Sequence, residues 1–185
     1  MTAPEAPVSR RITHAELVYR PGERALAARV FELLGCRVKD RGNHWFTAFV
    51  DPAVEDYTTN TLYASEVTPE QWAFEQELAG RLSGDLGDKA AAWTAHVRGN
   101  PQYSFHFGIR LATRDILERT LADIEEAGKN DPELAGRVSV SGVYRPEGPD
   151  AATDTMMQVF VHTDVIASGL LTFGQHVELQ WHVPS

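Results

Sequence analysis

The sequence predicts an α+β domain made of two copies of a βαβββ unit, with a helical hairpin inserted between the copies. In several short segments apolar and polar residues alternate, which is typical of strands with one buried face. In other segments apolar residues recur three or four positions apart, which is typical of amphipathic helices. The order of strand, helix and three further strands occurs twice along the chain, and this repetition indicates a duplication.

Composition narrows the class of protein. With 185 residues, 43% of them hydrophobic, the chain can form one domain with a substantial core. The net charge of −9 disfavours binding to nucleic acid, and no apolar run approaches the roughly 20 residues of a membrane span. The single cysteine, Cys36, excludes an internal disulfide. We expect a cytoplasmic protein, either a monomer or a homodimer, with a flexible tail at residues 1–10 and a single domain at 11–183.

The first copy is expected at residues 11–67. Leu26, Val30 and Leu33 lie on one face of a predicted helix at 23–34, and Gly35 is placed to end it. Its strands are predicted at 11–19, 36–39, 44–50 and 61–67.

The second copy is expected at residues 103–182. A helix is predicted at 114–127, with Leu117, Leu121 and Ile124 on its apolar face and Gly128 at its end. Its strands are predicted at 104–111, 137–144, 157–164 and 176–181, and a segment rich in proline and glycine predicts a loop at 145–154.

Residues 68–100 separate the two copies. Thr68 and Gln71 match a capping box, with Pro69 at the first helical position. Apolar residues at helical spacing follow, including Trp72 and Trp93. The segment is therefore predicted to be a helical hairpin, packed by its tryptophans on the outside of the domain.

Alternate strand positions show an unusual polar face. Opposite the apolar residues of four strands lie histidines, a tyrosine, an arginine and carboxylates, namely His14, Glu16, Tyr63, His106, Arg110, His176 and Glu178. Such alternation also fits an antiparallel sheet with one face in water. Histidine, tyrosine and serine are less typical of a solvent face than threonine or lysine, so a binding site is the competing interpretation.

Three segments carry a resemblance to a known family. The sequences are ITHAELVY at 12–19, FHFGIRL at 105–111 and FGQHVELQ at 173–180. They resemble the vicinal oxygen chelate superfamily, which includes glyoxalase I, extradiol dioxygenases, fosfomycin-resistance proteins and bleomycin-binding proteins. The resemblance covers 11–67 and 103–182. It implies paired βαβββ modules whose sheets curl around a central pocket with one divalent metal ion.

Carried over position by position, the resemblance places the metal ligands at His14, His106 and Glu178. The position of a fourth ligand in glyoxalase I falls on Tyr63, which favours a three-ligand site over glyoxalase I itself. Two imidazoles and one carboxylate suit Fe, Mn, Ni or Zn. Three protein ligands leave positions open for a substrate that binds through two adjacent oxygens.

Other polar residues are candidates for supporting roles. Tyr63, His162 and Glu16 are candidate catalytic groups, and Arg110 and His176 are candidates for binding substrate. Each also has an ordinary structural interpretation: a half-buried ring for Tyr63, a solvent-exposed side chain for Glu16 and a surface salt bridge for Arg110. His162 could pair with Asp164 as a base, although an aspartate at that place is also typical of a turn.

Two functions of different classes follow as expectations. The first is a metal-dependent enzyme, a dioxygenase, lyase or isomerase, acting on a small molecule with vicinal oxygens. The alternative is a non-catalytic small-molecule (drug) binding protein of the bleomycin-resistance type. A third expectation makes the inserted segment at 68–99 a surface for a partner protein. The substrate, the reaction and the metal stay open at this point.

Overall fold

The computed structural model describes residues 12–151 and 153–184, so the tail predicted at 1–10 lies outside the described residues. Two mixed β-sheets and four α-helices make up this part of the chain, and the predicted α+β class is confirmed. The first sheet contains β1 (His14–Tyr19), β2 (Arg37–Lys39), β3 (Trp45–Phe49), β4 (Thr61–Glu66) and β8 (Ile166–Ala167). The second contains β5 (His106–Arg110), β6 (Val138–Tyr144), β7 (Met156–Thr163) and β9 (Gln175–His182).

Strand order is the same in the two halves of the chain. The first sheet runs β2-β3-β4-β1, followed by β8, and the second runs β6-β7-β9-β5. In each sheet the first strand of its half pairs in parallel with the last, β1 with β4 and β5 with β9. The other pairs within each half are antiparallel. The two halves therefore share their strand order and their pattern of parallel and antiparallel pairs.

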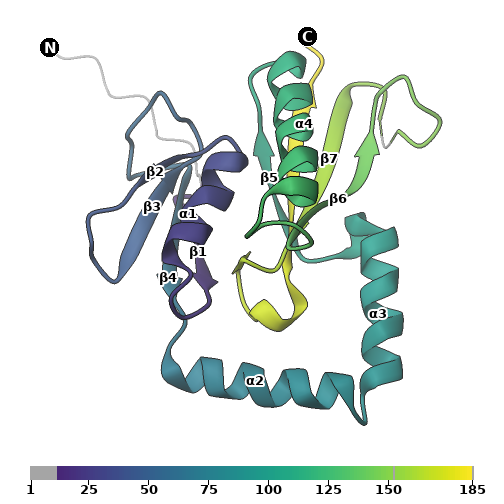
Figure 1. Ribbon diagram of the computed structural model, residues 1–185. Coiled ribbons are helices and arrows are strands. Elements are labelled where there is room, and N and C mark those ends of the chain that lie inside the picture. Colours follow the sequence, from purple (N-terminus) through teal and green to yellow (C-terminus); the bar gives the residue numbers. More distant parts are fainter. Residues whose placement is uncertain (1–11, 152, 185) are drawn as a thin grey trace, which may run out of the picture.

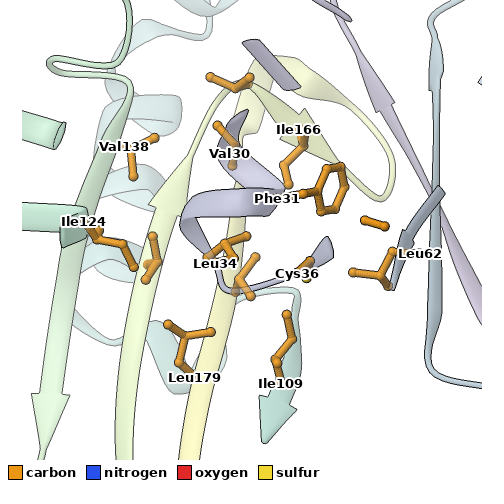
Figure 2. Packing of buried hydrophobic residues seen from close by; sticks show 14 of the residues in the cluster. Val30, Phe31, Leu34, Cys36, Leu62, Ile109, Ile124, Val138, Ile166 and Leu179 are labelled. Carbon is orange, nitrogen blue, oxygen red and sulfur yellow. The ribbon is translucent and has the colours of Figure 1, made fainter. Parts of the chain in front are cut away.

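One helix of each half packs on the apolar face of its sheet. These helices are α1 (Arg24–Leu33) and α4 (Arg114–Asn130), which lie between the sheets in Figure 1. A single core joins both halves: Leu34 lies near Ile109 and Leu179 of the second half, and Phe31 lies beside Ile166 (Figure 2). Burial of these apolar side chains supplies the main favourable term for folding. Within the described residues, no helix is both long enough and apolar enough to cross a bilayer.

The second half also contributes a strand to the first sheet. Residues 166–167 form β8, which pairs antiparallel with the end of β1 through Val18 and Tyr19. Arg137 adds polar contacts between the halves, since its guanidinium donates to both carboxylate oxygens of Glu23 at 2.8 and 2.9 Å and to Asp164 at 2.9 Å. These contacts fix one sheet against the other.

The segment between the halves is helical, as predicted, but it is not a hairpin of antiparallel helices. Thr68 caps α2 (Pro69–Ser83) by accepting from the Gln71 backbone amide, so the N-cap role of Thr68 is confirmed, whereas the side chain of Gln71 donates to Glu75 and to the carbonyl of Gly169. Figure 1 shows α2 running below both sheets and α3 (Gly87–Gly99) turning upward beside the second sheet. Buried Glu75 fixes α2 in this position by accepting from the amide and the hydroxyl of Thr172.

Two glycines predicted to end helices have different roles. Gly35 follows α1 with a φ of +88°, the left-handed conformation that glycine adopts without strain. Gly128 does not end α4, which continues to Asn130. A Cβ at Gly128 would lie 2.4 Å from the carbonyl oxygen of Val138, so glycine is needed here for close packing of α4 on β6.

Candidate functional site

The polar face of the second sheet carries the densest group of candidate residues. His106 of β5 pairs in register with His176 of β9, which pairs with His162 of β7. The three imidazoles therefore form one row across the sheet. Glu178 lies two residues beyond His176 on the same face, beside Gln158 of β7.

His106 and Glu178 form the central contact of this face. The Nε2 atom of His106 lies 3.5 Å from Oε2 of Glu178. The Nδ1 atom lies 2.9 Å from the carbonyl oxygen of Ser104, which can only accept, so Nδ1 carries the proton. Glu178 is 4% exposed and accepts from the amide of Gln158. A carboxylate this buried requires such partners.

His106 and Glu178 are placed so that one proton or one cation can lie between them. With Nδ1 protonated, Nε2 turns a lone pair toward Glu178 unless it too is protonated. A lone pair facing a carboxylate oxygen is unfavourable, whereas one proton or one cation between the two atoms relieves the repulsion. The pair can therefore accept a proton from a neighbouring molecule or contribute two ligands to a metal ion.

The equivalent residues of the first sheet are more open. His14 and Glu16 are exposed, with 4.0 Å between Nε2 and the nearer carboxylate oxygen. The ring of Tyr63 is half-buried, 5.3 Å from the His14 ring and 5.1 Å from that of Trp45. Tyr63 thus packs among aromatic neighbours on the face where it was predicted.

His14 and His106 line the same cavity from opposite sheets. The cavity has a volume of about 1060 Å³ and lies between β1 and β4 on one side and β5 on the other. Arg110 also lines it, and among residues 12–151 and 153–184 no ion pair involves this arginine. The cavity offers a free guanidinium and two imidazoles to a bound molecule.

Only part of the predicted metal-ligand set is brought together in the described residues. His106 and Glu178 are brought together, but within the described part of the chain no three His, Cys, Asp or Glu side chains are grouped so that they could hold a metal ion. His14 therefore does not complete a set with the other two. A metal ion bound by all three residues stays a prediction.

Neither a scan against protein-family models nor a search of the curated proteins finds a match for this chain. The resemblance to the vicinal oxygen chelate superfamily consequently has no support from these comparisons. Function must be argued from the geometry alone.

His162 and His176 line a second, smaller cavity rather than the large one. Their rings are 5.0 Å apart, and Nε2 of His176 lies 3.0 Å from the hydroxyl of Ser141. Burial lowers the pKa of His162, and burial followed by the charges of His162 and His106 lowers the pKa of His176 to about 4. Both imidazoles are neutral at pH 7.

Asp164 is not a partner of His162 for base catalysis. It accepts from Arg20 at 2.7 Å and from Arg137 at 2.9 Å, within the ion-pair network between the halves. Its carboxylate is therefore occupied by structural contacts.

Sequence reasoning missed two residues that shape the site. Gln158 orients Glu178, and the carbonyl of Ser104 sets the tautomer of His106. Strand parity provides a signal for Gln158, since it lies on the same face of its strand as His162. No sequence signal identifies a backbone carbonyl as the partner of a particular imidazole.

Proposed function

We propose that this protein binds a small molecule with two adjacent oxygen atoms, a hydroxy-carbonyl or a catechol, in the cavity between the sheets. His106 and Glu178 take a proton from it. The observation that carries the proposal is the 3.5 Å contact between Nε2 of His106 and Oε2 of Glu178 beside a cavity of about 1060 Å³ that His106 lines.

The chemistry follows from the available groups. A hydroxyl of the bound molecule loses its proton to Nε2 of His106, and Glu178 stabilises the imidazolium that forms. The pair of electrons from the O–H bond stays on the substrate oxygen, and Arg110 is the cation available to stabilise that oxyanion. The matching strand order of the two halves also supports the finer proposal of paired βαβββ modules forming a central pocket.

The test uses 4-nitrocatechol, whose absorption moves to longer wavelength when it ionises. Titration into the protein at a pH where the free compound is mostly protonated should produce the spectrum of the ionised form. 4-Nitrophenol, which has one oxygen instead of two, should bind at least about tenfold more weakly. The variant H106A should lose the spectral change, whereas H44A, which removes an exposed histidine outside the cavity, should retain it.

Two results would overturn the proposal. Absence of any spectral change with the unaltered protein would reject the cavity as a site for vicinal oxygens. Binding without ionisation would reject proton transfer and leave the non-catalytic binding function.

A metal-dependent enzyme is the second candidate, favoured by the same two facing acceptor atoms. His106 and Glu178 would hold the ion, which would supply Lewis-acid chemistry to the adjacent oxygens when bound. Because His14 is not in place as a third ligand, we assign no step to the metal. Elemental analysis after incubation with Fe, Mn, Ni or Zn should give about one ion per chain, lost in H106A. Equal metal content in the variant would reject this candidate.

A further inference from the structure

The smaller cavity has features that the proposed function does not use. It has a volume of about 390 Å³ and lies between helix α3 and the segment at 167–176. Volumes of this order are typical of small-molecule sites. Its position under the inserted segment separates it from the cavity that His14, His106 and Arg110 line.

Most of its wall is apolar. Trp93 and Val97 of α3 face Phe105, Leu170 and Phe173 across the cavity. The rings of Trp93 and Phe173 meet edge to face with their centroids 5.1 Å apart. The apolar part of a ligand with one or two aromatic rings would pack favourably against such a wall.

The polar groups of the cavity are few. His162 and His176 are uncharged, and each uses Nε2 for a contact within the protein, to the carbonyl of Phe173 and the hydroxyl of Ser141. Neither imidazole therefore provides a charge to a ligand at neutral pH.

One cation stands beside these neutral groups. Arg98 lies in the last turn of α3 and lines the cavity. It is exposed, and where the structure describes the chain no ion pair or hydrogen bond occupies its guanidinium. Its charge also contributes to lowering the pKa of both histidines, in agreement with a position close to them. An unpaired guanidinium next to an apolar cavity matches a ligand with one anionic end.

We propose that this second cavity binds an apolar monocarboxylate, an aromatic acid of one or two rings, with its hydrocarbon body against Trp93 and Phe173 and its carboxylate on Arg98. The site is independent of the proposed function, because it uses neither His106, Glu178 nor Arg110.

The test compares two probes of the same shape by isothermal titration calorimetry. These are 2-naphthoate and its uncharged analogue 2-naphthalenemethanol. The unaltered protein should bind the acid at least about tenfold more tightly than the alcohol, since the charge-assisted contact is available only to the acid. R98Q should weaken 2-naphthoate binding at least about tenfold and leave binding of the alcohol within about twofold.

Two further variants locate the site. R119Q removes an exposed arginine of α4 that has no ion pair within the described residues, and it should leave both affinities unchanged. T94F places a ring on the cavity side of α3, where Thr94 is only half-buried, so the fold should persist while both probes lose binding. Circular dichroism checks that T94F is folded.

Each of three experimental outcomes would overturn the proposal. Failure of the folded, unaltered protein to bind either probe overturns it. Equal loss of 2-naphthoate binding in R98Q and R119Q also overturns it, because the effect would then arise from net charge rather than from Arg98. Retained binding in folded T94F would place the probes elsewhere and overturn the assigned cavity.

Discussion

The two sheets of this molecule share one strand order, yet beyond the opening histidine the equivalent positions of their polar faces differ. In the first, His14 stands in register with Thr61, and Tyr63 occupies the position two residues further along. In the second, His106 stands in register with His176, and Glu178 occupies that position. A histidine opens both faces, but the carboxylate near His14, that of Glu16, is exposed at 4.0 Å, whereas the carboxylate of Glu178 is buried at 3.5 Å from His106.

The faces also differ in their cover. α3 and the segment before β9 lie over the histidine row of the second sheet, where His176 is 3% exposed. On the first sheet His14 and Glu16 remain exposed. The shared strand order thus places two similar faces in the molecule, while one buried carboxylate and the inserted helix make only the second chemically distinctive.

The largest expected effect is a loss of stability in weak acid that His176 of the second sheet contributes. Because the pKa of His176 is about 4 in the folded protein and 6.5 ordinarily, the unfolded chain binds more protons between these values. Stability is fully present above pH 6.5 and falls as the pH drops toward 4, by about 3 kcal/mol. Urea denaturation at about pH 7 and about pH 5 measures the part of this change that falls between those values, about 2 kcal/mol.

Substitution at His176 should flatten this dependence. H176Q removes the titrating imidazole. The equivalent residue of the first sheet, Thr61, has no titratable side chain. H44Q, at an exposed histidine, should keep the full dependence. An unaltered acid slope in H176Q would show that the duplicated faces do not differ in this way.

The second prediction concerns close packing in the second half. G128A should destabilise the protein by about 2 kcal/mol, because its Cβ would lie 2.4 Å from the backbone oxygen of Val138. At Gly80, also inside a helix, a Cβ would meet nothing within 4 Å, so G80A should stabilise by about 0.5–1 kcal/mol. Opposite signs in urea denaturation would confirm the packing role, and stabilisation by both would contradict it.

The comparison of the two glycines that were predicted to end helices shows where sequence reasoning succeeds. Gly35 and Gly128 are nearly equally spaced from the first histidine of their halves, and both were predicted to end helices. The φ of +88° confirms the role of Gly35. Gly128 lies within a helix because its requirement arises from a neighbouring strand, which is distant in sequence.

The candidate site, like the two glycines, was predicted from the sequence only in part. Counting along the last strand of each half placed Tyr63 where the second half has Glu178, and the register confirms this equivalence. Side-chain alternation placed His106 and Glu178 on one face. The distance of His14 from them was not predictable, because it depends on how two separate sheets pack through α1, α4 and β8. The position of α3 over the second sheet depends on the angle between α2 and α3 (Figure 1). The spacing of apolar residues predicts the helices but not the angle between them.

The third prediction tests the polar contact that holds the halves together. R137M should destabilise by about 1–2 kcal/mol, because it leaves the carboxylates of Glu23 and Asp164 without their shared partner. R81M, which breaks an exposed pair within α2, should have little effect on the urea midpoint. Equal effects of the two would indicate that Arg137 contributes no more than a surface ion pair.

The smallest expected effect distinguishes the two opening histidines in binding. H106A should weaken 4-nitrocatechol binding at least about tenfold, whereas H14A should weaken it less than about threefold. His14 is exposed, and among residues 12–151 and 153–184 its ring nitrogens contact Thr13 and, at 4.0 Å, Glu16, neither of which is buried. At His106 the same truncation leaves Glu178, which is 4% exposed, without its imidazole.

Repeating both titrations with added Zn or Mn sharpens the comparison. If the ion draws His14 into a shared site, the H14A loss should grow to match that of H106A only when metal is present. Matching losses without metal would instead show that both sheets contribute equally, and the asymmetry inferred from Tyr63 and Glu178 would then be wrong.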